Sequence, residues 1–361
     1  MRRLVLWVMA GLSLILPLRG AQASDAALDP RDSDNPYGVL AFLHWDHDWN
    51  DHHFKPADVE KAADLMQEAG IGWVRVDFLW DDVEPSRGQW RWDKYDHLVE
   101  TLRSRGVRIL GILNYNVGWA SSRWNQAPDR QLYVEYARAV VARYKDRVRY
   151  WEIWNEPDSK VYWDPQDDML SYTELLKAVY PAIKAEDPTS RVVLGGLSQG
   201  LPFPLKRVYQ HGGKDHFDIV NIHPFADPLL SESKTSYRGL YRSVKKTMEK
   251  YGDGDKEIWF TEIGCPGVPA DRLSRGWWMG KSPDEETQAR WLEHVFTESF
   301  KWPGVKRVFW AFLRDTPDHF KNDIDHFGIL REDFSKKPAY ETLKRLTAER
   351  AAGVATGKDP A

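Results

Sequence analysis

The sequence predicts one α/β domain, a (β/α)8 TIM barrel in which eight parallel strands close into a ring with helices outside. Short β-branched or aromatic runs alternate with longer runs of helical period, which is typical of a parallel α/β sheet. About eight such units follow one another, as a barrel requires. An open doubly wound sheet is the alternative, but no glycine-rich phosphate-binding turn follows any expected strand.

The expected strands are runs of the kind that is buried on both faces of a parallel sheet. In chain order they span residues 38–43, 73–79, 108–113, 149–154, 191–195, 218–222, 257–261 and 307–312.

Helices are expected between these strands. Pro56 stands where the first would begin and Gly70 where it would end, because proline suits a first helical turn and glycine suits the left-handed residue after a helix. Gly106 and Gly252 close other helices in the same way. The expected helices span residues 56–69, 94–104, 130–144, 169–185, 205–211, 233–251, 284–300 and 338–351.

Composition sets the broad class. With 42% hydrophobic and 29% charged residues, the 361-residue chain can bury a large core. Its net charge of -4, with both signs interspersed, argues against a nucleic-acid partner. We expect a monomer with its barrel over residues 37–351, a polar segment over 24–36 before it and a flexible tail over 352–361.

The N-terminus resembles a secretory signal. Two arginines precede an apolar run over residues 4–16, and Pro17 and the small residues up to Ala23 follow it. The run is short for a membrane anchor, so we expect cleavage after Ala23, no membrane span in the mature protein and export to the periplasm or the medium. The single cysteine, Cys265, cannot form an internal disulfide and is expected to be a buried apolar residue.

Two glutamates end buried runs. Glu156 lies in WNEP after the fourth expected strand, and Glu262 lies in TEIG at the end of the seventh. Strand C-termini of a barrel share one mouth, so residues roughly a hundred positions apart should face each other there. Paired carboxylates suit glycosidic bond cleavage, in which one attacks the anomeric carbon and the other protonates the leaving oxygen.

These motifs, with Arg75 in WVRVDF and Trp310 in VFWAF, resemble the retaining glycoside hydrolases of clan A. The spread of units, the early signal and the closing FGIL and DFSKKPAY runs are most similar to family 39, including its bacterial exopolysaccharide-degrading members. The resemblance covers residues 37–346.

The resemblance implies a role for each matching residue. Glu156 would be the acid/base and Glu262 the nucleophile. Asn155 would bond the sugar 2-hydroxyl, Arg75 would lie beneath the nucleophile and keep it ionised, and His223 would hydrogen-bond near the nucleophile. The bland alternatives are a salt bridge from Arg75 to a nearby acid and a purely structural His223.

One position departs from the clan pattern. Phe225 stands where clan members often carry a tyrosine that contacts the nucleophile, and Tyr115 is a candidate to replace that hydroxyl. Trp310 is expected to form the floor of the sugar site. Other tryptophans near strand ends could stack on sugar rings or simply pack: Trp45, Trp49, Trp80, Trp119, Trp124, Trp163, Trp277 and Trp278.

The loop HWDHDWNDHHF, residues 44–54, is rich in histidine and aspartate. Its spacing matches no zinc motif, so we favour a polar rim of the cleft, with His44 nearest the substrate, over a metal site. No metal or cofactor is expected. Arg272, Arg275 and Lys281 could grip an acidic sugar, although a solvated loop is the simpler interpretation.

The sequence therefore predicts an exported retaining glycosidase that cleaves a polysaccharide, either an exopolysaccharide or a plant cell-wall glycan. The alternatives are a barrel that binds glycan without cutting it and a metal-dependent hydrolase that uses the loop over residues 44–53. Endo and exo action both stay open.

Overall fold

The structure is a computed structural model that describes residues 35–47, 53–230, 233 and 236–355. The expected signal peptide, most of the polar segment, Trp49 and the end of the expected tail lie outside these residues. Within the described residues, no helix is long and apolar enough to span a membrane.

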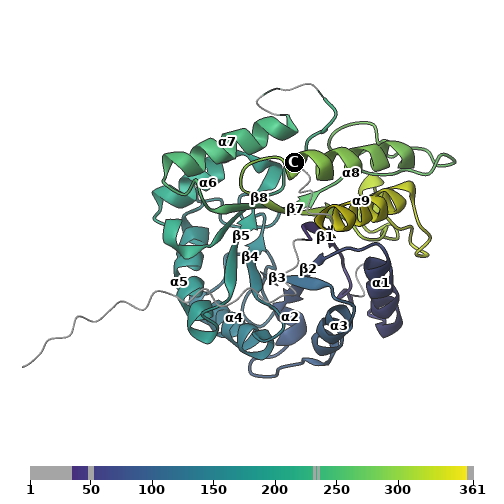
Figure 1. The fold of residues 1–361 in the computed structure, drawn as a ribbon. Helices are drawn as coiled ribbons and strands as arrows, with labels where there is room; N and C mark the ends of the chain where they lie inside the picture. The colour runs from purple at the N-terminus through teal and green to yellow at the C-terminus, as the bar shows by residue number, and fades with distance from the viewer. Residues whose placement is uncertain (1–34, 48–52, 231–232, 234–235, 356–361) are drawn as a thin grey trace, which may run out of the picture. The chain divides into compact units, whose positions relative to one another are not determined.

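Eight parallel strands form a closed barrel in sequence order, and the first pairs with the last (Figure 1). The predicted fold class is confirmed. The strands are β1 (Tyr37–Leu40), β2 (Trp73–Leu79), β3 (Arg108–Asn114), β4 (Tyr150–Asn155), β5 (Arg191–Gly196), β6 (Ile219–Ile222), β7 (Glu257–Ile263) and β8 (Val305–Ala311).

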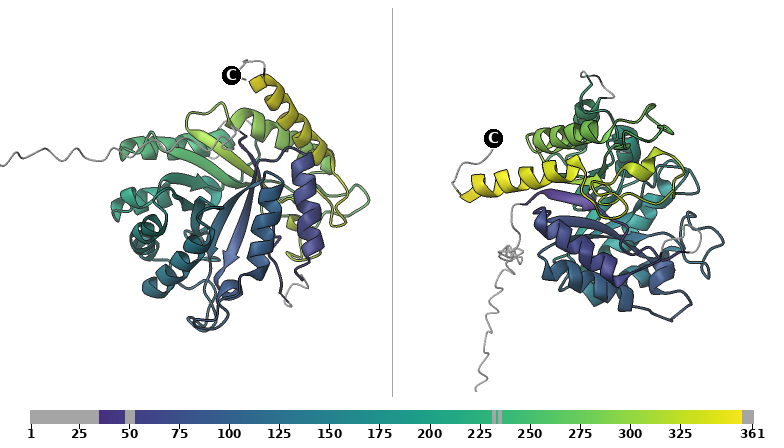
Figure 2. Two further views of the ribbon diagram at one scale, coloured as in Figure 1. Left: turned by 60° about the horizontal axis from the view of Figure 1, so that its bottom comes forward. Right: turned by 90° about the vertical axis from the view of Figure 1, so that its right-hand side faces the viewer.

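Helices surround the barrel. Figure 2 shows the C-terminal helix, drawn in yellow, on the outside of the barrel. Helix α9 packs against α8 and also reaches α1, where the Tyr340 hydroxyl donates to the Leu65 carbonyl. The helices are α1 (Pro56–Glu68), α2 (Trp80–Val83), α3 (Asp93–Ser104), α4 (Arg130–Tyr144), α5 (Leu170–Glu186), α6 (Pro202–Gln210), α7 (Tyr237–Lys250), α8 (Glu285–Ser299) and α9 (Pro338–Ala355), with 3-10 turns η2 (Ser198–Gly200), η3 (Lys214–His216) and η4 (Asp323–His326).

The interior of the barrel is filled in layers. One layer is apolar and is made by Trp73, Leu110, Val193, Ile219, Trp259 and Phe309. Because side chains alternate along a strand, Arg75, two residues after Trp73, also faces inward, toward the C-terminal mouth. The sequence thus places a charged layer directly above an apolar floor.

Most boundaries agree with the sequence prediction within two or three residues. Gly70, Gly106 and Gly252 have positive φ values of 66°, 75° and 73°, as expected for residues that end helices. The short helix α2 was not predicted, and α9 runs four residues past the expected end.

Strand β1 is shorter than predicted. It ends at Leu40, which pairs with Arg75 and Ala311, rather than at residue 43. Beyond it the chain turns so that Phe42 stacks on Trp45, with ring centroids 3.9 Å apart. The apolar residues after Leu40 therefore pack at the mouth instead of extending the ladder.

Candidate active site

Glu156 and Glu262 both lie at the C-terminal mouth of the barrel, as the sequence predicts. Glu156 follows β4 directly, and Glu262 is the penultimate residue of β7. The backbone at the end of β4 is unusual, since Trp154 and Glu156 have φ values of 67° and 43°. The strand therefore turns sharply where it delivers the carboxylate.

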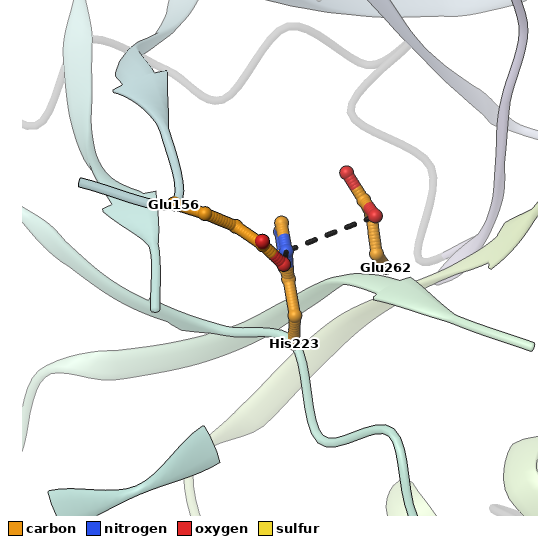
Figure 3. Close-up of side chains that lie close together, drawn as sticks. All are labelled: Glu156, His223 and Glu262. Carbon is orange, nitrogen blue, oxygen red and sulfur yellow. Dashed lines mark hydrogen bonds and ion pairs between the residues drawn. The ribbon is translucent and has the colours of Figure 1, made fainter. Parts of the chain in front are cut away.

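The two carboxylates and His223 form one group (Figure 3). One ligand atom from each of the three residues lies within 4.8 Å of those of the other two. Retaining glycosidases hold their carboxylates about 5 to 5.5 Å apart and inverting enzymes at least about 6.5 Å, so this spacing fits direct nucleophilic attack.

Arg75 holds Glu262 and the residues beside it from below. Its Nη1 donates to Glu262 Oε1 at 2.5 Å, and its Nε and Nη2 form a bidentate pair with Glu152 at 2.8 Å each. Nη2 also donates to Asn155 Oδ1 at 2.9 Å. Arg75, Glu152 and Asn155 are buried, so the guanidinium is locked in one orientation.

The same contacts orient Asn155. Its side-chain oxygen is occupied by Arg75, which turns the amide N–H groups toward the cavity that Asn155 lines. An N–H donor beside the nucleophile is what a sugar hydroxyl would need, so this geometry agrees with the role that the resemblance implies.

The two glutamates experience different electrostatic environments. Burial raises the pKa of Glu156 to about 7, with a smaller opposing effect from Arg75. Burial also raises the pKa of Glu262, and the positive charge of the directly bonded Arg75 opposes part of this rise. Glu156 is therefore suited to hold a proton near neutral pH, and Glu262 is suited to be ionised.

His223 lies closer to Glu156 than to Glu262. Its Nδ1 is 2.9 Å from Glu156 Oε1 and 3.8 Å from Glu262 Oε2, whereas the sequence prediction put it next to the nucleophile. Burial lowers the pKa of His223, so the ring is neutral near pH 7.

A cavity of about 930 Å³ opens above these residues. Its polar lining comes mostly from the β1 to β4 side, whereas aromatic side chains come from both sides of the mouth. The lining residues include His44, Asp77, Asp81, Tyr115, Asn116, Asn155, Glu156, Tyr162 and Glu262, and the aromatic residues Phe225, Trp278, Phe312, Phe320 and Phe327.

His44 and Tyr115 lie where the sequence prediction placed them, on the cavity wall. His44 is fully buried, and neither ring nitrogen has a hydrogen-bond partner within the described part of the chain; its nearest acid is Asp77, at 3.7 Å. Burial holds the pKa of His44 well below its usual value.

Neither Trp310 nor Trp119 is among the described residues that line the cavity, so the expected sugar-site floor at Trp310 is wrong, and of the two alternatives for Trp119 the structure shows packing. Trp310 has no exposed surface and donates to the Phe327 carbonyl, and Phe309 instead faces the barrel interior. Trp119 donates to the Glu84 carbonyl and packs edge-on against Trp80. Of the remaining tryptophans in the described residues, Trp45, Trp124 and Trp278 line the cavity.

Two residues of the site were missed at the sequence level. Glu152 lies in the middle of an apolar strand, and a charge there signals a buried partner, which is Arg75. Tyr162 lines the cavity, and the negative charges of Glu156 and Glu262 add to the effect of burial in raising its pKa. It is therefore a second candidate, besides Tyr115, for the hydroxyl that Phe225 lacks.

One group of side chains in the described residues has the spacing of metal ligands. Among the described residues, the grouping of potential ligands is Glu156, His223 and Glu262, rather than the histidines of the loop over residues 44–54, of which 48–52 lie outside the description. The Arg75 guanidinium bonded to Glu262 and the two hydrogen bonds of His223 oppose a cation at this position.

Comparison with known proteins gives a consistent picture. The sequence model described as Cellulase (glycosyl hydrolase family 5) matches residues 39–312. Endo-1,4-beta-xylanase B of Thermotoga neapolitana is 22% identical over 312 residues, which cover 81% of this chain and 85% of the relative.

Solved structures with the same fold include a family 39 glycoside hydrolase from Bacteroides cellulosilyticus WH2, with a TM-score of 0.68 and 23% identity. The match covers 87% of this chain but only 64% of that one. Xylanase 10B of Thermotoga maritima gives a TM-score of 0.62 at 17% identity, over 88% of this chain and 97% of the xylanase. Family 39 is thus among the structural neighbours, while the matching sequence model is that of family 5.

Proposed function

The chain belongs to the cellulase family, glycosyl hydrolase family 5, and is a retaining glycosidase of clan A; from this premise we propose that it cleaves an uncharged, β-linked polysaccharide by a two-glutamate double displacement. The observation that carries the proposal is the pair Glu156 and Glu262, whose carboxyl oxygens approach within 4.8 Å at the base of the cavity.

In the first step, Glu262 attacks the anomeric carbon while Glu156 gives its proton to the leaving glycosidic oxygen, and the carbon–oxygen bond breaks. In the second step, Glu156 takes a proton from water, whose oxygen bonds to the anomeric carbon as the bond to Glu262 breaks. Arg75 holds Glu262 in line for attack, and Asn155 offers an N–H to the sugar as positive charge develops.

The charge of the cavity supports an uncharged substrate. The carboxyl groups of Asp77, Asp81, Glu156 and Glu262 line it, and the single lysine or arginine among the described lining residues is Arg75. That guanidinium is fully engaged with Glu152, Glu262 and Asn155. A uronate would therefore meet negative charge without a free lysine or arginine among the described lining residues.

The loop cations that could have gripped an acidic sugar have other contacts. Arg275 donates to Asp318 and Asp325 and lies 3.9 Å from Asp323. Neither it nor Arg272 nor Lys281 lines the cavity. These contacts favour neutral plant cell-wall glycans such as xylan, and the neutral exopolysaccharides that the family 39 resemblance suggests, over acidic ones.

The direct test is a screen of purified polysaccharides with product sizes read by mass spectrometry. Xylan, β-glucans, mannose-rich exopolysaccharides and acidic exopolysaccharides would each be incubated with the protein and with Glu262→Ala. We expect release of oligosaccharides from a neutral glycan by the wild type alone. Binding without any turnover would instead support a glycan-binding barrel.

We also propose that the protein is exported after cleavage behind Ala23. The apolar run over residues 4–16 and the small residues before the expected cleavage site support this. N-terminal sequencing of the protein from the periplasm or medium of an expressing bacterium should begin at Ser24. An intact N-terminus in the cytoplasm would contradict export.

A further inference from the structure

A row of hydrogen bonds lies behind Glu156, in side chains that do not line the cavity. His223 Nδ1 is 2.9 Å from Glu156 Oε1, and His223 Nε2 is 2.9 Å from Thr261 Oγ1. The Thr261 hydroxyl is in turn 2.9 Å from Asn221 Oδ1. His223, Thr261 and Asn221 have no exposed surface.

The backbone fixes the direction of these hydrogen bonds. The Thr261 N–H donates to Asn221 Oδ1 at 3.2 Å, so the atom that faces Thr261 must be the carbonyl oxygen of the Asn221 side chain. This oxygen can only accept, and it therefore receives the hydrogen of the Thr261 hydroxyl. The hydroxyl has one hydrogen, so it presents a lone pair to His223 Nε2.

It follows that His223 Nε2 carries a hydrogen. In a neutral imidazole the other nitrogen, Nδ1, is then an acceptor, and the hydrogen in its bond to Glu156 must come from the carboxyl group. Resting on the catalytic role proposed for Glu156, we propose that Asn221 and Thr261 are positioning residues that fix the Nε2–H tautomer of His223 and so keep Glu156 protonated as the general acid.

The effect works mainly on the ionised form of Glu156. A carboxylate there faces the lone pair of Nδ1 instead of a donor, which destabilises it and raises its proton affinity. Burial of both residues acts in the same direction. The other ionisable groups that act on Glu156 or His223 are Arg75 on β2, Glu152 on β4, Asp158 and Tyr162 after β4, and Glu262 on β7.

Both chemical steps benefit. A rotation about the last bond of Glu156 turns its proton from Nδ1 to the leaving glycosidic oxygen. The carboxylate that remains is poorly stabilised by His223 and is therefore a stronger base toward the water that attacks the glycosyl–Glu262 ester. The proton taken from that water restores the starting state.

Thr261→Val is the informative variant, because it removes the lone pair that holds the Nε2–H tautomer. The imidazole can then place its hydrogen on Nδ1 and donate to the Glu156 carboxylate, which lowers the pKa of Glu156. We expect the basic limb of the kcat/KM profile to move down by about one pH unit. Activity would fall about tenfold near pH 8 and less than about twofold near pH 5.

Thr261→Ser restores the hydroxyl and should restore the wild-type profile. Thr173→Val is a matched control, since it removes another fully buried threonine hydroxyl, which donates to the Met169 carbonyl on the outer helix α5. We expect it to leave the profile unchanged. An equal loss at every pH in Thr261→Val would show a merely structural role and overturn the proposal.

A second measurement does not depend on turnover or on the Thr261→Val variant. In the ¹⁵N NMR spectrum of the wild type, His223, assigned by its loss in His223→Gln, should show a protonated Nε2 and an unprotonated Nδ1 near pH 6. We call the hydrogen bonds from Asn221 through Thr261 and His223 to Glu156 the relay. An Nδ1–H tautomer of His223 would refute the proposed relay even if the enzyme is active. An Nε2–H tautomer in a protein without glycosidase activity would leave the relay standing and refute the proposed function instead.

Discussion

At the scale of single residues, the site depends on giving two identical side chains opposite properties. The carboxyl group of Glu156 lies next to the neutral imidazole of His223. The carboxylate of Glu262 instead accepts a hydrogen bond from the Arg75 guanidinium, at 2.5 Å. Coupling to a fixed cation favours the ionised form, and burial without one favours the protonated form. Environment alone thus separates the acid from the nucleophile.

The first prediction concerns the pH dependence of activity. The pKa of Glu156 is raised to about 7, and the first step needs its proton, so kcat/KM should fall as pH rises through about 7. Glu156→Gln should lower kcat/KM at least about a hundredfold and remove this limb for substrates with good leaving groups. A basic limb near pH 4.5, the ordinary value for glutamate, would contradict the assignment.

The same shift predicts a change in stability. Folded Glu156 holds its proton up to about pH 7 and the unfolded chain only to about 4.5, so the wild type loses stability as pH rises between these values. Glutamine cannot ionise and avoids the loss. In urea unfolding, Glu156→Gln should exceed the wild type by up to about 3 kcal/mol near pH 8 and match it near pH 4. A difference that is independent of pH would refute this account.

The sequence predicts which residues belong to the site where they lie in a recognisable motif. It predicts them less well where the direction of a side chain decides. The glutamates, Arg75 and Asn155 followed from motifs at strand ends. Trp310 did not, because a strand sends alternate side chains to opposite faces, and the sequence does not say that Phe309 takes the inward face. Because Phe309 faces the barrel interior, the side chain of Trp310 points to the other face of the strand and packs in the core outside the barrel.

At the scale of elements, the C-terminal ends of β4, β5, β6 and β7 together form the candidate active site. Gly196 ends β5 beside the His223 imidazole, and a Cβ at this position would lie 1.9 Å from Nε2. Its N–H also donates to Glu152, which holds Arg75. Position 196 therefore has to be a glycine, without a side chain, for His223 to reach Glu156.

Gly196→Ala tests this packing. The added methyl group would displace His223 and break its bonds to Glu156 and Thr261, so we expect kcat/KM to fall at least about tenfold. Gly118→Ala is a matched control, because a Cβ at Gly118 would meet nothing within 4 Å. Equal activity of the two variants would contradict the close approach.

The order of these elements was predictable because the units repeat, whereas their exact ends were not. Strand β1 stops three residues early because Phe42 turns to stack on Trp45, a contact between side chains that no local propensity encodes. The relay from Asn221 to Glu156 likewise joins β6, β7 and β4, and it needs the register of the barrel to be visible.

At the scale of the whole molecule, the proposed preference for a neutral glycan depends on the charges around the cavity. Four carboxyl groups and one engaged guanidinium line a cavity of about 930 Å³. The net charge of the chain, -4, has the same sign. On this proposal, an acidic glycan would be repelled by the net charge at a distance and by the lining carboxylates at contact.

We therefore predict discrimination by charge. For two oligosaccharides that differ by one uronic acid at the cleaved unit, kcat/KM should be at least about tenfold higher for the neutral one. Added salt should reduce this ratio of kcat/KM values, because it screens the repulsion between charges. Initial rates at low and high ionic strength would measure it. A preference for the acidic oligosaccharide would mean that a cation outside the described residues reaches the substrate.

The most direct test of the central claim is the anomeric configuration of products rescued by azide. In Glu262→Ala, azide should replace the nucleophile and give a glycosyl azide of inverted configuration. In Glu156→Ala, azide should attack the glycosyl–Glu262 ester and give an azide of retained configuration. Swapped configurations, or full activity of Glu262→Ala without azide, would contradict the assignment of the two glutamates.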